Sequence, residues 1–255
     1  MTETETWTET GNTGTAPGEA RETTTADARE TRAEGGRVVV VGDALIDEMR
    51  EPDSLREFPG GAALNVAVGL SVLGVPATLI AMVGDDADGA VLRDFLAAVG
   101  DGEHRLVIDP NPRAGMLHDK SLFVRNFERA AARSLLTKVG DEDAELLYGS
   151  TLEELRERLV ASGTHHVLAT AGRAGASIET DDGLLVSEPI APLPGAVVDT
   201  MGGGDATLAS SVQSFLTEGV PTDAAGWQHL LASAMRIAAA TCRSEGALLR
   251  VPPAL

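Results

Sequence analysis

The stretch DTMGGGD, from Asp199 to Asp205, places three consecutive glycines and a carboxylate ahead of a helix-like run that extends from Ala206 to Leu216. Glycines let the backbone turn sharply and let a ligand approach main-chain N–H groups. A helix that begins near Asp205 adds unpaired N–H groups and the positive end of its dipole at the same place. This combination predicts an anion site. A carboxylate beside a phosphate needs a function, and a general base for a substrate hydroxyl is the function that fits.

A simpler structure also explains this stretch. Aspartate commonly caps a helix N-terminus after a glycine turn. The segment alone does not distinguish a capped helix from a phosphate site.

A second cluster repeats the order of a glycine pair followed by a helix. In GGAALNVAVGLSVLG, Gly60 and Gly61 permit close approach of a ligand, and Asn65 can donate and accept hydrogen bonds to a polyol. Asp43 and Asp47 follow the first predicted strand and can accept hydrogen bonds from hydroxyls. In isolation, a plain loop and an exposed polar face remain the simpler explanations.

Around these clusters, continuously apolar β-branched runs alternate with helical patterns. The alternation predicts an α/β fold, with a mainly parallel central sheet and helices on both faces. Ligands then bind beyond the carboxyl ends of the strands. The predicted strands are 37–42, 77–84, 106–109, 166–170, 183–188 and 197–199, and the predicted helices are 62–73, 88–99, 123–136, 151–162, 206–216 and 227–242.

Composition limits the remaining possibilities. Residues 1–36 contain eleven Thr and eight acidic residues against three Arg, which predicts a disordered acidic tail ahead of one domain over 37–255. A net charge of −19 argues against nucleic-acid and anionic-membrane partners. A single cysteine, Cys242, excludes an intrachain disulfide. We found no run of membrane-spanning length and no secretory signal, and we expect a cytoplasmic protein.

Common nucleotide-binding signatures are missing. The chain has two lysines, Lys120 and Lys138, and neither follows a glycine, which excludes a Walker A loop. The first strand runs into GDALID instead of GxGxxG, so the dinucleotide fingerprint is missing as well.

Together, GGAALNVAVGLSVLGVPATLIAMVGDD from Gly60 and DTMGGGDA from Asp199 resemble the two signatures of the ribokinase-like (PfkB) carbohydrate kinases. GDALID, DPNPR at Asp109 to Arg113 and the order of elements are most similar to the fructokinase-like branch. The resemblance covers about Val38 to Ala247. It implies transfer of the ATP γ-phosphoryl group to a sugar hydroxyl with Mg²⁺, and fructose or a related ketose or keto-acid sugar is the expected acceptor.

The resemblance also implies roles for individual residues. Asp205 matches the catalytic base, and the anion hole matches Gly202, Gly203 and Gly204. The sugar contacts match Asp43, Asp47, Gly60, Gly61 and Asn65, and the nucleotide contacts match Thr170, Gly172 and Thr200. Asp143 takes the acidic place of the metal-organising segment, although Gly140 stands where Asn is expected, and Asp199 matches a carboxylate beside a monovalent-cation (K⁺) site. An ordinary acidic helix start also explains Asp141 to Asp143.

One segment departs from the family pattern. Only Ala87 to Ile108 separates VGDD from DPNPR, where the family has several dozen more residues, including strands of a lid over the sugar. We therefore predict that lid strands are missing and that the protein is a monomer. Two alternatives stay open: a degenerate member that binds nucleotide or sugar without turnover, and a kinase for a nucleoside or another non-sugar acceptor.

Overall fold

The structure is a computed structural model that describes residues 38–43, 45–51, 54–81 and 105–252. All of them belong to one compact unit, Gly35–Leu255. The tail predicted at 1–36 and the helix predicted at 88–99 lie outside the described residues. No helix in the described part of the chain is long and apolar enough to cross a membrane.

The largest sheet has five strands in the order β5-β6-β7-β8-β9. The three strands β5, β6 and β7 are parallel, whereas β8 pairs antiparallel with both β7 and β9. The sheet is therefore mixed rather than mainly parallel. The strands are β5 (Val107–Ile108), β6 (Leu136–Gly140), β7 (His166–Thr170), β8 (Ala176–Thr180) and β9 (Leu185–Glu188).

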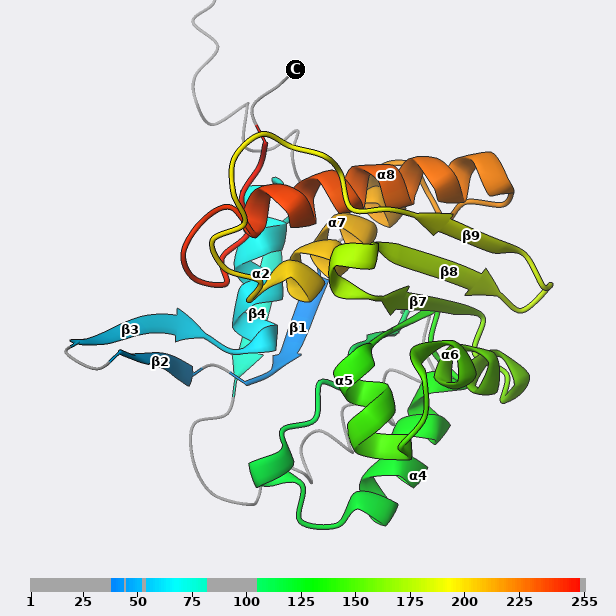
Figure 1. Cartoon of the computed structure of the whole chain (residues 1–255). Coiled ribbons are helices and arrows are strands. Elements are labelled where there is room, and N and C mark those ends of the chain that lie inside the picture. Colours follow the sequence, from blue (N-terminus) through cyan, green and yellow to red (C-terminus); the bar gives the residue numbers. More distant parts are fainter. Residues whose placement is uncertain (1–37, 44, 52–53, 82–104, 253–255) are drawn as a thin grey trace, which may run out of the picture. The chain divides into compact units, whose positions relative to one another are not determined.

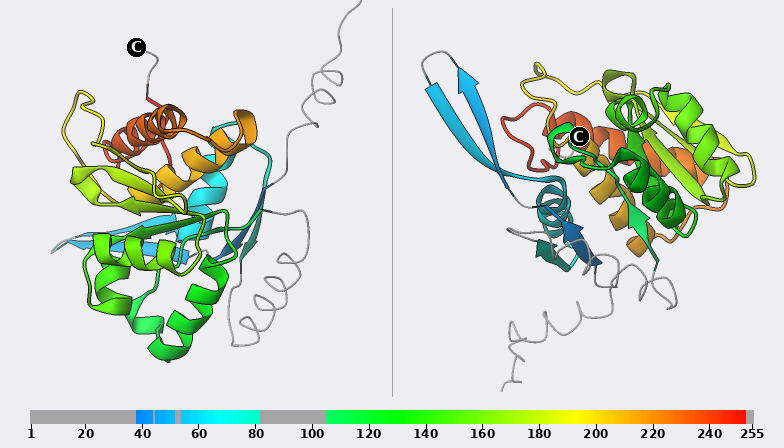
Figure 2. Two further views of the ribbon diagram at one scale, coloured as in Figure 1. Left: turned by 90° about the vertical axis from the view of Figure 1, so that its right-hand side faces the viewer. Right: turned by 90° about the horizontal axis from the view of Figure 1, so that it is seen from below.

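Two smaller sheets come from the N-terminal part of the domain. The first is a parallel pair of β1 (Val38–Gly42) and β4 (Ala77–Ala81). The second is an antiparallel hairpin of β2 (Leu45–Glu51) and β3 (Ser54–Gly60). Figure 2 shows the hairpin as a two-stranded ribbon outside the five-stranded sheet. Neither strand of this hairpin was predicted from the sequence.

Helices cover both faces of the five-stranded sheet (Figure 1). On β7, Leu168 packs into one core with Trp227 and Leu231, while Val167 and Ala169 pack into a second core on the opposite face. Successive strand residues point to opposite faces, so an entirely apolar strand is buried on both sides. The helices are α2 (Ala62–Val72), α4 (Lys120–Ala131), α5 (Asp141–Asp143), α6 (Leu152–Ala161), α7 (Gly203–Thr217) and α8 (Ala224–Thr241).

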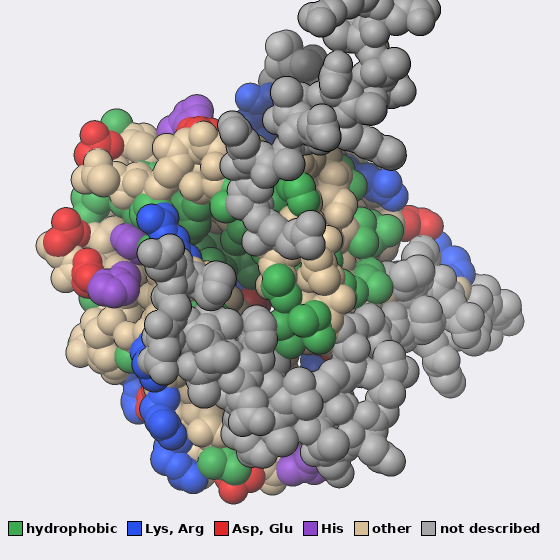
Figure 3. All heavy atoms as spheres, turned by 180° about the vertical axis from the view of Figure 1, so that it is seen from behind, with side chains coloured by type: hydrophobic (Ala, Val, Ile, Leu, Met, Phe, Trp, Pro, Cys, Tyr) green, Lys and Arg blue, Asp and Glu red, His purple; other side chains and the backbone are tan. Residues whose placement is uncertain are grey.

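Three short helical turns complete the secondary structure: η1 (Ala114–Met116), η2 (Ala144–Tyr148) and η3 (Gly172–Ala174). On the face shown in Figure 3, Lys and Arg side chains gather at the lower left, and Asp and Glu side chains lie at several other points.

Two of the secondary-structure predictions need correction, and two strands of the main sheet, β6 and β8, were not predicted. The helix predicted over 123–136 ends at Ala131, where the Ser134 hydroxyl donates a 2.8 Å hydrogen bond to the Ala131 carbonyl, and β6 begins at Leu136. The strand predicted at 197–199 is wrong, because the N–H groups of Val198 and Asp199 bond to the carbonyl of Cys242 at the end of α8 instead of a neighbouring strand.

The predicted loss of lid strands concerns Ala87 to Ile108, and most of this segment lies outside the described residues. The hairpin β2–β3 occupies a different part of the chain, directly between Asp43 and Gly61. The deletion therefore stays a prediction, and the described part of the domain does contain a hairpin separate from the main sheet.

Candidate active site

The glycines of the DTMGGGD stretch form the start of α7. Gly202 is the N-cap, in a left-handed conformation with φ 72°, and Gly203 and Gly204 are the first helical residues. A Cβ on Gly202 would lie 2.0 Å from the Ala247 carbonyl oxygen, so only glycine fits. Gly203 donates its N–H to the Thr200 carbonyl at 3.4 Å. The N–H groups of Gly204 and Asp205 have no carbonyl available within the helix and can bind an anion.

Asp205 is the third residue of α7, and its side chain does not cap the helix. The Asp205 carboxylate instead accepts a 2.8 Å hydrogen bond from Nδ2 of Asn65, which lies 140 positions earlier in the chain. The pKa of Asp205 is raised to about 6, mainly by burial. The nearby charges of Asp109 and Asp43 also raise this pKa, whereas the hydrogen bond from Asn65 and the charge of Lys138 lower it. The interpretation of Asp205 as an N-cap is therefore wrong.

The second glycine cluster forms the start of α2. Gly61 is the N-cap of this helix with φ 100°, and Gly60 is the last residue of β3. The Leu64 N–H donates to the carbonyl of Asp43 at 3.3 Å, which holds the end of β1 against the first turn of α2. Asn65 is buried, and its Oδ1 has no partner among the described residues. The unpaired oxygen can accept a hydrogen bond from a ligand hydroxyl.

Asp47, the remaining predicted sugar contact, lies on β2 opposite Phe58 of β3. Its side chain is outside the described part of the structure, so its contact with a sugar stays a prediction.

The structure also shows an ion pair beside these groups. The sequence did not predict this pair as part of the site. Lys138 Nζ lies 2.9 Å from Asp109 Oδ2, and the two side chains are 11% and 8% exposed. Asp109 directly follows β5 and Lys138 lies on the adjacent strand β6. A Cβ built on Gly204 would lie 3.0 Å from Lys138 Nζ. The ammonium group therefore lies against the first turn of α7.

Charge and burial compete at this cluster. Burial is the largest influence on Lys138 and lowers its pKa, but the carboxylates of Asp109, Asp143 and Asp205 more than offset it, so the pKa lies above its ordinary value. Asp143 accepts a 2.7 Å hydrogen bond from the Gly140 N–H. Burial raises the pKa of Asp143 to about 6 in spite of the Lys138 charge.

The predicted nucleotide residues lie in two places. Thr170 ends β7, pairs with Gly140 of β6 and donates its hydroxyl to the Val139 carbonyl at 3.2 Å. Gly172 begins η3 with φ 49°. Thr200 is exposed in the loop before α7. The structure thus brings Thr170 next to the segment of Asp143, while Thr200 lies in the loop 199–202 that leads into α7.

Asp199, the predicted neighbour of a monovalent cation, ties two loops together. Its Oδ1 accepts from the Met201 N–H at 2.9 Å and its Oδ2 from the Gly246 N–H at 3.2 Å. Both oxygens are therefore engaged with backbone groups. Asp199 therefore holds the loop before α7 against the segment that contains Gly246 and Ala247.

A metal ion at this site would depend on the carboxylates that the described residues offer. No group of three or more His, Cys, Asp or Glu side chains that could hold a metal ion occurs among the residues that the structure describes. Mg²⁺ usually keeps several waters and binds through one or two carboxylates together with substrate phosphates. Asp143 can supply one such carboxylate, so the residues present suit an ion that arrives with a nucleotide better than one held by the protein alone.

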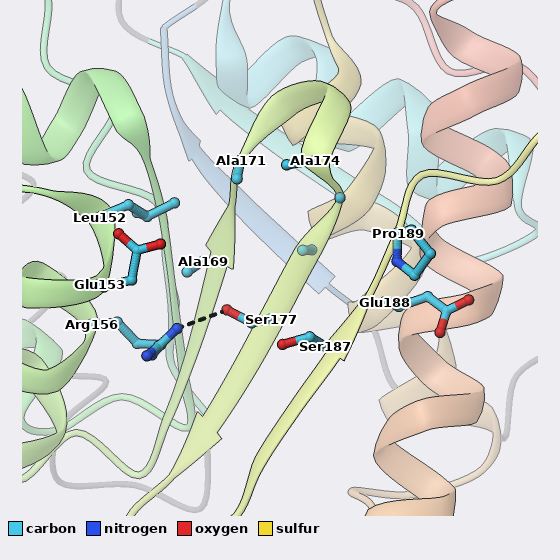
Figure 4. A pocket seen from close by; sticks show the side chains of 12 residues that line it. Leu152, Glu153, Arg156, Ala169, Ala171, Ala174, Ser177, Ser187, Glu188 and Pro189 are labelled. Atoms are coloured by element: carbon cyan, nitrogen blue, oxygen red, sulfur yellow. Dashed lines mark hydrogen bonds between the residues drawn. The ribbon is translucent and has the colours of Figure 1, made fainter.

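Figure 4 shows a separate pocket of about 340 Å³ between α6 and strands β7 to β9. Arg156 lines it and donates to Ser177 at 3.1 Å and to Glu179 at 2.7 Å. Ala171, which lies between Thr170 and Gly172, also contributes to the wall. None of the predicted site residues lines this pocket.

Comparisons with known proteins are consistent with this geometry. The model of the pfkB family of carbohydrate kinases matches residues 36–118 and 107–253. A fructokinase of Salmonella typhimurium is 24% identical over 302 aligned positions, which cover 85% of this chain and 96% of the relative. The aligned stretch is longer than the chain's 255 residues, so part of the relative has no counterpart here.

Solved structures show the same fold. The aminoimidazole riboside kinase of Salmonella enterica, complexed with aminoimidazole riboside and an ATP analogue, has a TM-score of 0.68 at 21% identity, covering 84% of this chain and 95% of the other. The fructokinase of Vibrio cholerae O395, bound to fructose, ADP and calcium, has a TM-score of 0.70 at 16% identity, covering 85% and 96%. These similarities confirm the predicted ribokinase-like α/β fold.

Proposed function

This chain belongs to the pfkB family of carbohydrate kinases, and we propose that it transfers the γ-phosphoryl group of ATP to a hydroxyl of a sugar. The observation that carries the proposal is the hydrogen bond between Asn65 and Asp205 at the start of α7. This hydrogen bond brings the start of α2, whose glycines suit a polyol, next to the start of α7, whose glycines suit a phosphate. The two helix starts meet at the carboxylate of Asp205. The acceptor hydroxyl would then lie between the sugar-side groups and the transferred phosphoryl group.

The acceptor that fits is fructose or a related ketose or keto-acid sugar. Asn65 presents an unpartnered Oδ1 from the first turns of α2, and the charge of Asp43, which follows β1, interacts with Asp205. Such hydrogen-bond acceptors suit a ligand with several hydroxyls. Several relatives by sequence are fructokinases, which supports a ketose over other sugars.

Asp205 is the proposed general base. Its carboxylate accepts the proton of the attacking hydroxyl, and the N–H groups of Gly204 and Asp205 stabilise charge on the phosphoryl group as the bond to ADP breaks. Mg²⁺ brought in with ATP would neutralise further phosphate charge, with Asp143 as a ligand or an organiser of its waters. Thr170, Gly172 and Thr200 are the proposed nucleotide contacts, and a K⁺ ion beside Asp199 would complete the cofactors.

A coupled assay of ADP release over a panel of sugars tests this function. The panel contains fructose, other ketoses, keto-acid sugars and aldoses, and nucleosides with aminoimidazole riboside as a separate arm. Turnover on a sugar supports the proposal. Turnover only with the nucleosides would show that the enzyme is a kinase with a nucleoside as its acceptor. Binding of an ATP analogue by calorimetry, with no ADP released on any acceptor, would identify a degenerate member instead.

The activity should depend on pH through Asp205. Since burial raises the pKa of Asp205 to about 6, the base is protonated below this pH, and kcat/KM should fall about tenfold per pH unit there and level off above it. Asp143 has a similar pKa and can make the fall steeper. A kcat/KM that stays constant from pH 7 to pH 5, with circular dichroism showing a folded protein throughout, would contradict Asp205 as the base.

We also infer that the protein is a monomer in solution, because the strands that form the dimer contact in many members are those predicted to be missing. Multi-angle light scattering should give a mass near the 26.4 kDa of one chain. A mass near twice this value would mean that another surface, such as the hairpin β2–β3, forms the contact.

A further inference from the structure

The phosphate site is crowded with negative charge. Three carboxylates lie close enough to Lys138 to raise its pKa, namely those of Asp109, Asp143 and Asp205. A nucleotide would bring several more negative charges to the start of α7. Like charges at close range repel, and in a partly buried site the repulsion is weakly screened. A cation at this point would therefore stabilise a bound phosphate more than it would on the surface.

Lys138 is the cation at this point. A Cβ on Gly204 would lie 3.0 Å from Lys138 Nζ and 3.2 Å from its Cε. The space that a side chain at position 204 would fill is thus the space in front of the ammonium group. Because Gly204 is the second helical residue of α7, the ammonium group and the unpaired N–H groups of the helix point to one small region.

The partner of Lys138 is incompletely bonded. Lys138 Nζ donates to Oδ2 of Asp109 at 2.9 Å, whereas Oδ1 of Asp109 is buried and has no partner among the described residues. Oδ1 of Asn65 is in the same condition. Buried polar atoms usually have a hydrogen-bond partner, and those without one commonly mark a ligand or water site. These atoms indicate that the cluster is built for a ligand and is more than an internal ion pair.

We propose that Lys138 is a catalytic residue that contacts the transferred phosphoryl group, and that Asp109 holds it in place when no nucleotide is bound. This inference rests on the proposed kinase activity. In the reaction, the acceptor oxygen forms a bond to the γ-phosphorus, the bond to the ADP oxygen breaks, and the acceptor proton passes to Asp205. Lys138 keeps its protons throughout and neutralises negative charge on the phosphoryl oxygens.

The chain offers a matched control, since Lys120 is its other lysine and lies exposed at the start of α4. Lys138→Met removes the charge and keeps an unbranched side chain that is one atom shorter, and we expect it to lower kcat about 10²–10³-fold, as loss of a charge-stabilising donor does. Lys120→Met should stay within about twofold of the wild type, as expected for a surface position away from the site. A Lys138→Met kcat equal to that of the wild type would overturn the proposal.

A double variant distinguishes a structural role of Lys138 from a catalytic one. Lys138→Met alone leaves Asp109 buried and unpaired, which can destabilise the fold. Asp109→Asn in the same chain removes this charge. If the pair only supports the fold, the double variant recovers both melting temperature and kcat. Under our proposal it recovers the melting temperature, whereas kcat remains reduced.

A measurement without turnover separates this inference from the kinase proposal. With ¹⁵N-labelled lysine, the two side-chain signals can be followed by NMR as ligands are added to the wild-type protein. A non-hydrolysable ATP analogue should shift the Lys138 signal, and adenosine, which lacks phosphates, should not. The Lys120 signal should stay in place in both cases. An unchanged Lys138 signal at saturating analogue would overturn the inference even if sugar phosphorylation is observed.

Absence of turnover on every acceptor, together with a shifted Lys138 signal, would instead remove the kinase activity. Lys138 would then be a phosphate-binding residue without a catalytic role, and the inference as stated would fail with the proposed function. The assay therefore tests the catalytic role of Lys138 together with the proposed function, whereas the NMR measurement tests its phosphate contact independently of turnover.

Discussion

Replacing Asp205 by asparagine is expected to lower kcat about 10²–10⁴-fold, the range of general-base contributions. The amide has nearly the shape of the carboxylate and can still accept from Asn65, which now bonds to Asp205 at 2.8 Å. It cannot take the proton of the acceptor hydroxyl. The measurement is ADP release with the best acceptor of the sugar panel, and a variant as active as the wild type would exclude Asp205 as the base.

The substitution should not unfold the protein, and the melting temperature checks this. Burial raises the pKa of Asp205 to about 6, so the stability that its protonated form contributes is present at low pH and lost as pH rises through 6. Asparagine carries no charge to bury at neutral pH. The variant should therefore melt at or above the wild-type temperature at pH 7.5, and Asp181→Asn, at an exposed position after β8, serves as the control substitution.

The second large effect is expected at Gly202, the N-cap of α7. Gly202→Ala would place a Cβ 2.0 Å from the Ala247 carbonyl oxygen in a residue with φ 72°. A left-handed conformation costs a non-glycine residue about 1–2 kcal/mol, and overpacking costs about 1–3 kcal/mol more. We expect the free energy of unfolding to fall by about 2–5 kcal/mol, measured by urea denaturation, and the loop before α7 to lose its shape.

Gly219 provides the matched control at the other end of the same helix. Its φ is 87°, but a Cβ built there would meet no atom within 4 Å. Gly219→Ala should therefore cost about 1–2 kcal/mol, the conformational cost alone. Equal losses in the two variants would show that the contact with Ala247 is not what requires glycine at position 202.

The parts of the site that could be predicted are those with a local signal. Glycine pairs followed by helical patterns mark the starts of α2 and α7, and both helices lie where the sequence placed them. Strand β8 had a signal that was overlooked, because Ala176 and Ile178 alternate with the polar Ser177 and Glu179 in ASIET, as in a strand with one face toward a core. The structure buries Ala176, Ile178 and Thr180.

The ion pair of Lys138 and Asp109 could not be derived in the same way. It depends on the pairing of β5 with β6, in which Ile108 lies opposite Thr137. Register between strands is set by the whole core and is not written in either segment alone. Two hints were present: Lys138 in the segment LTKVG, which has no other charged residue, and Asp109 directly after a predicted strand of a parallel sheet. No strand had been predicted at 136–140, so the first hint carried little information. Neither identifies the other as its partner.

The tight packing of α2 on the C-terminal part of the chain has a consequence for synthesis on the ribosome. A Cβ on Gly69 would lie 3.1 Å from Cβ of Ala209 and 3.0 Å from Cδ1 of Leu249, so this face of α2 is covered by residues near the end of the chain. During synthesis the N-terminal part of a domain leaves the ribosome first. The apolar face of α2 therefore stays partly exposed until Leu249 has left the exit tunnel. A nascent chain stalled before this point would leave this face of α2 exposed and would be a substrate for chaperones.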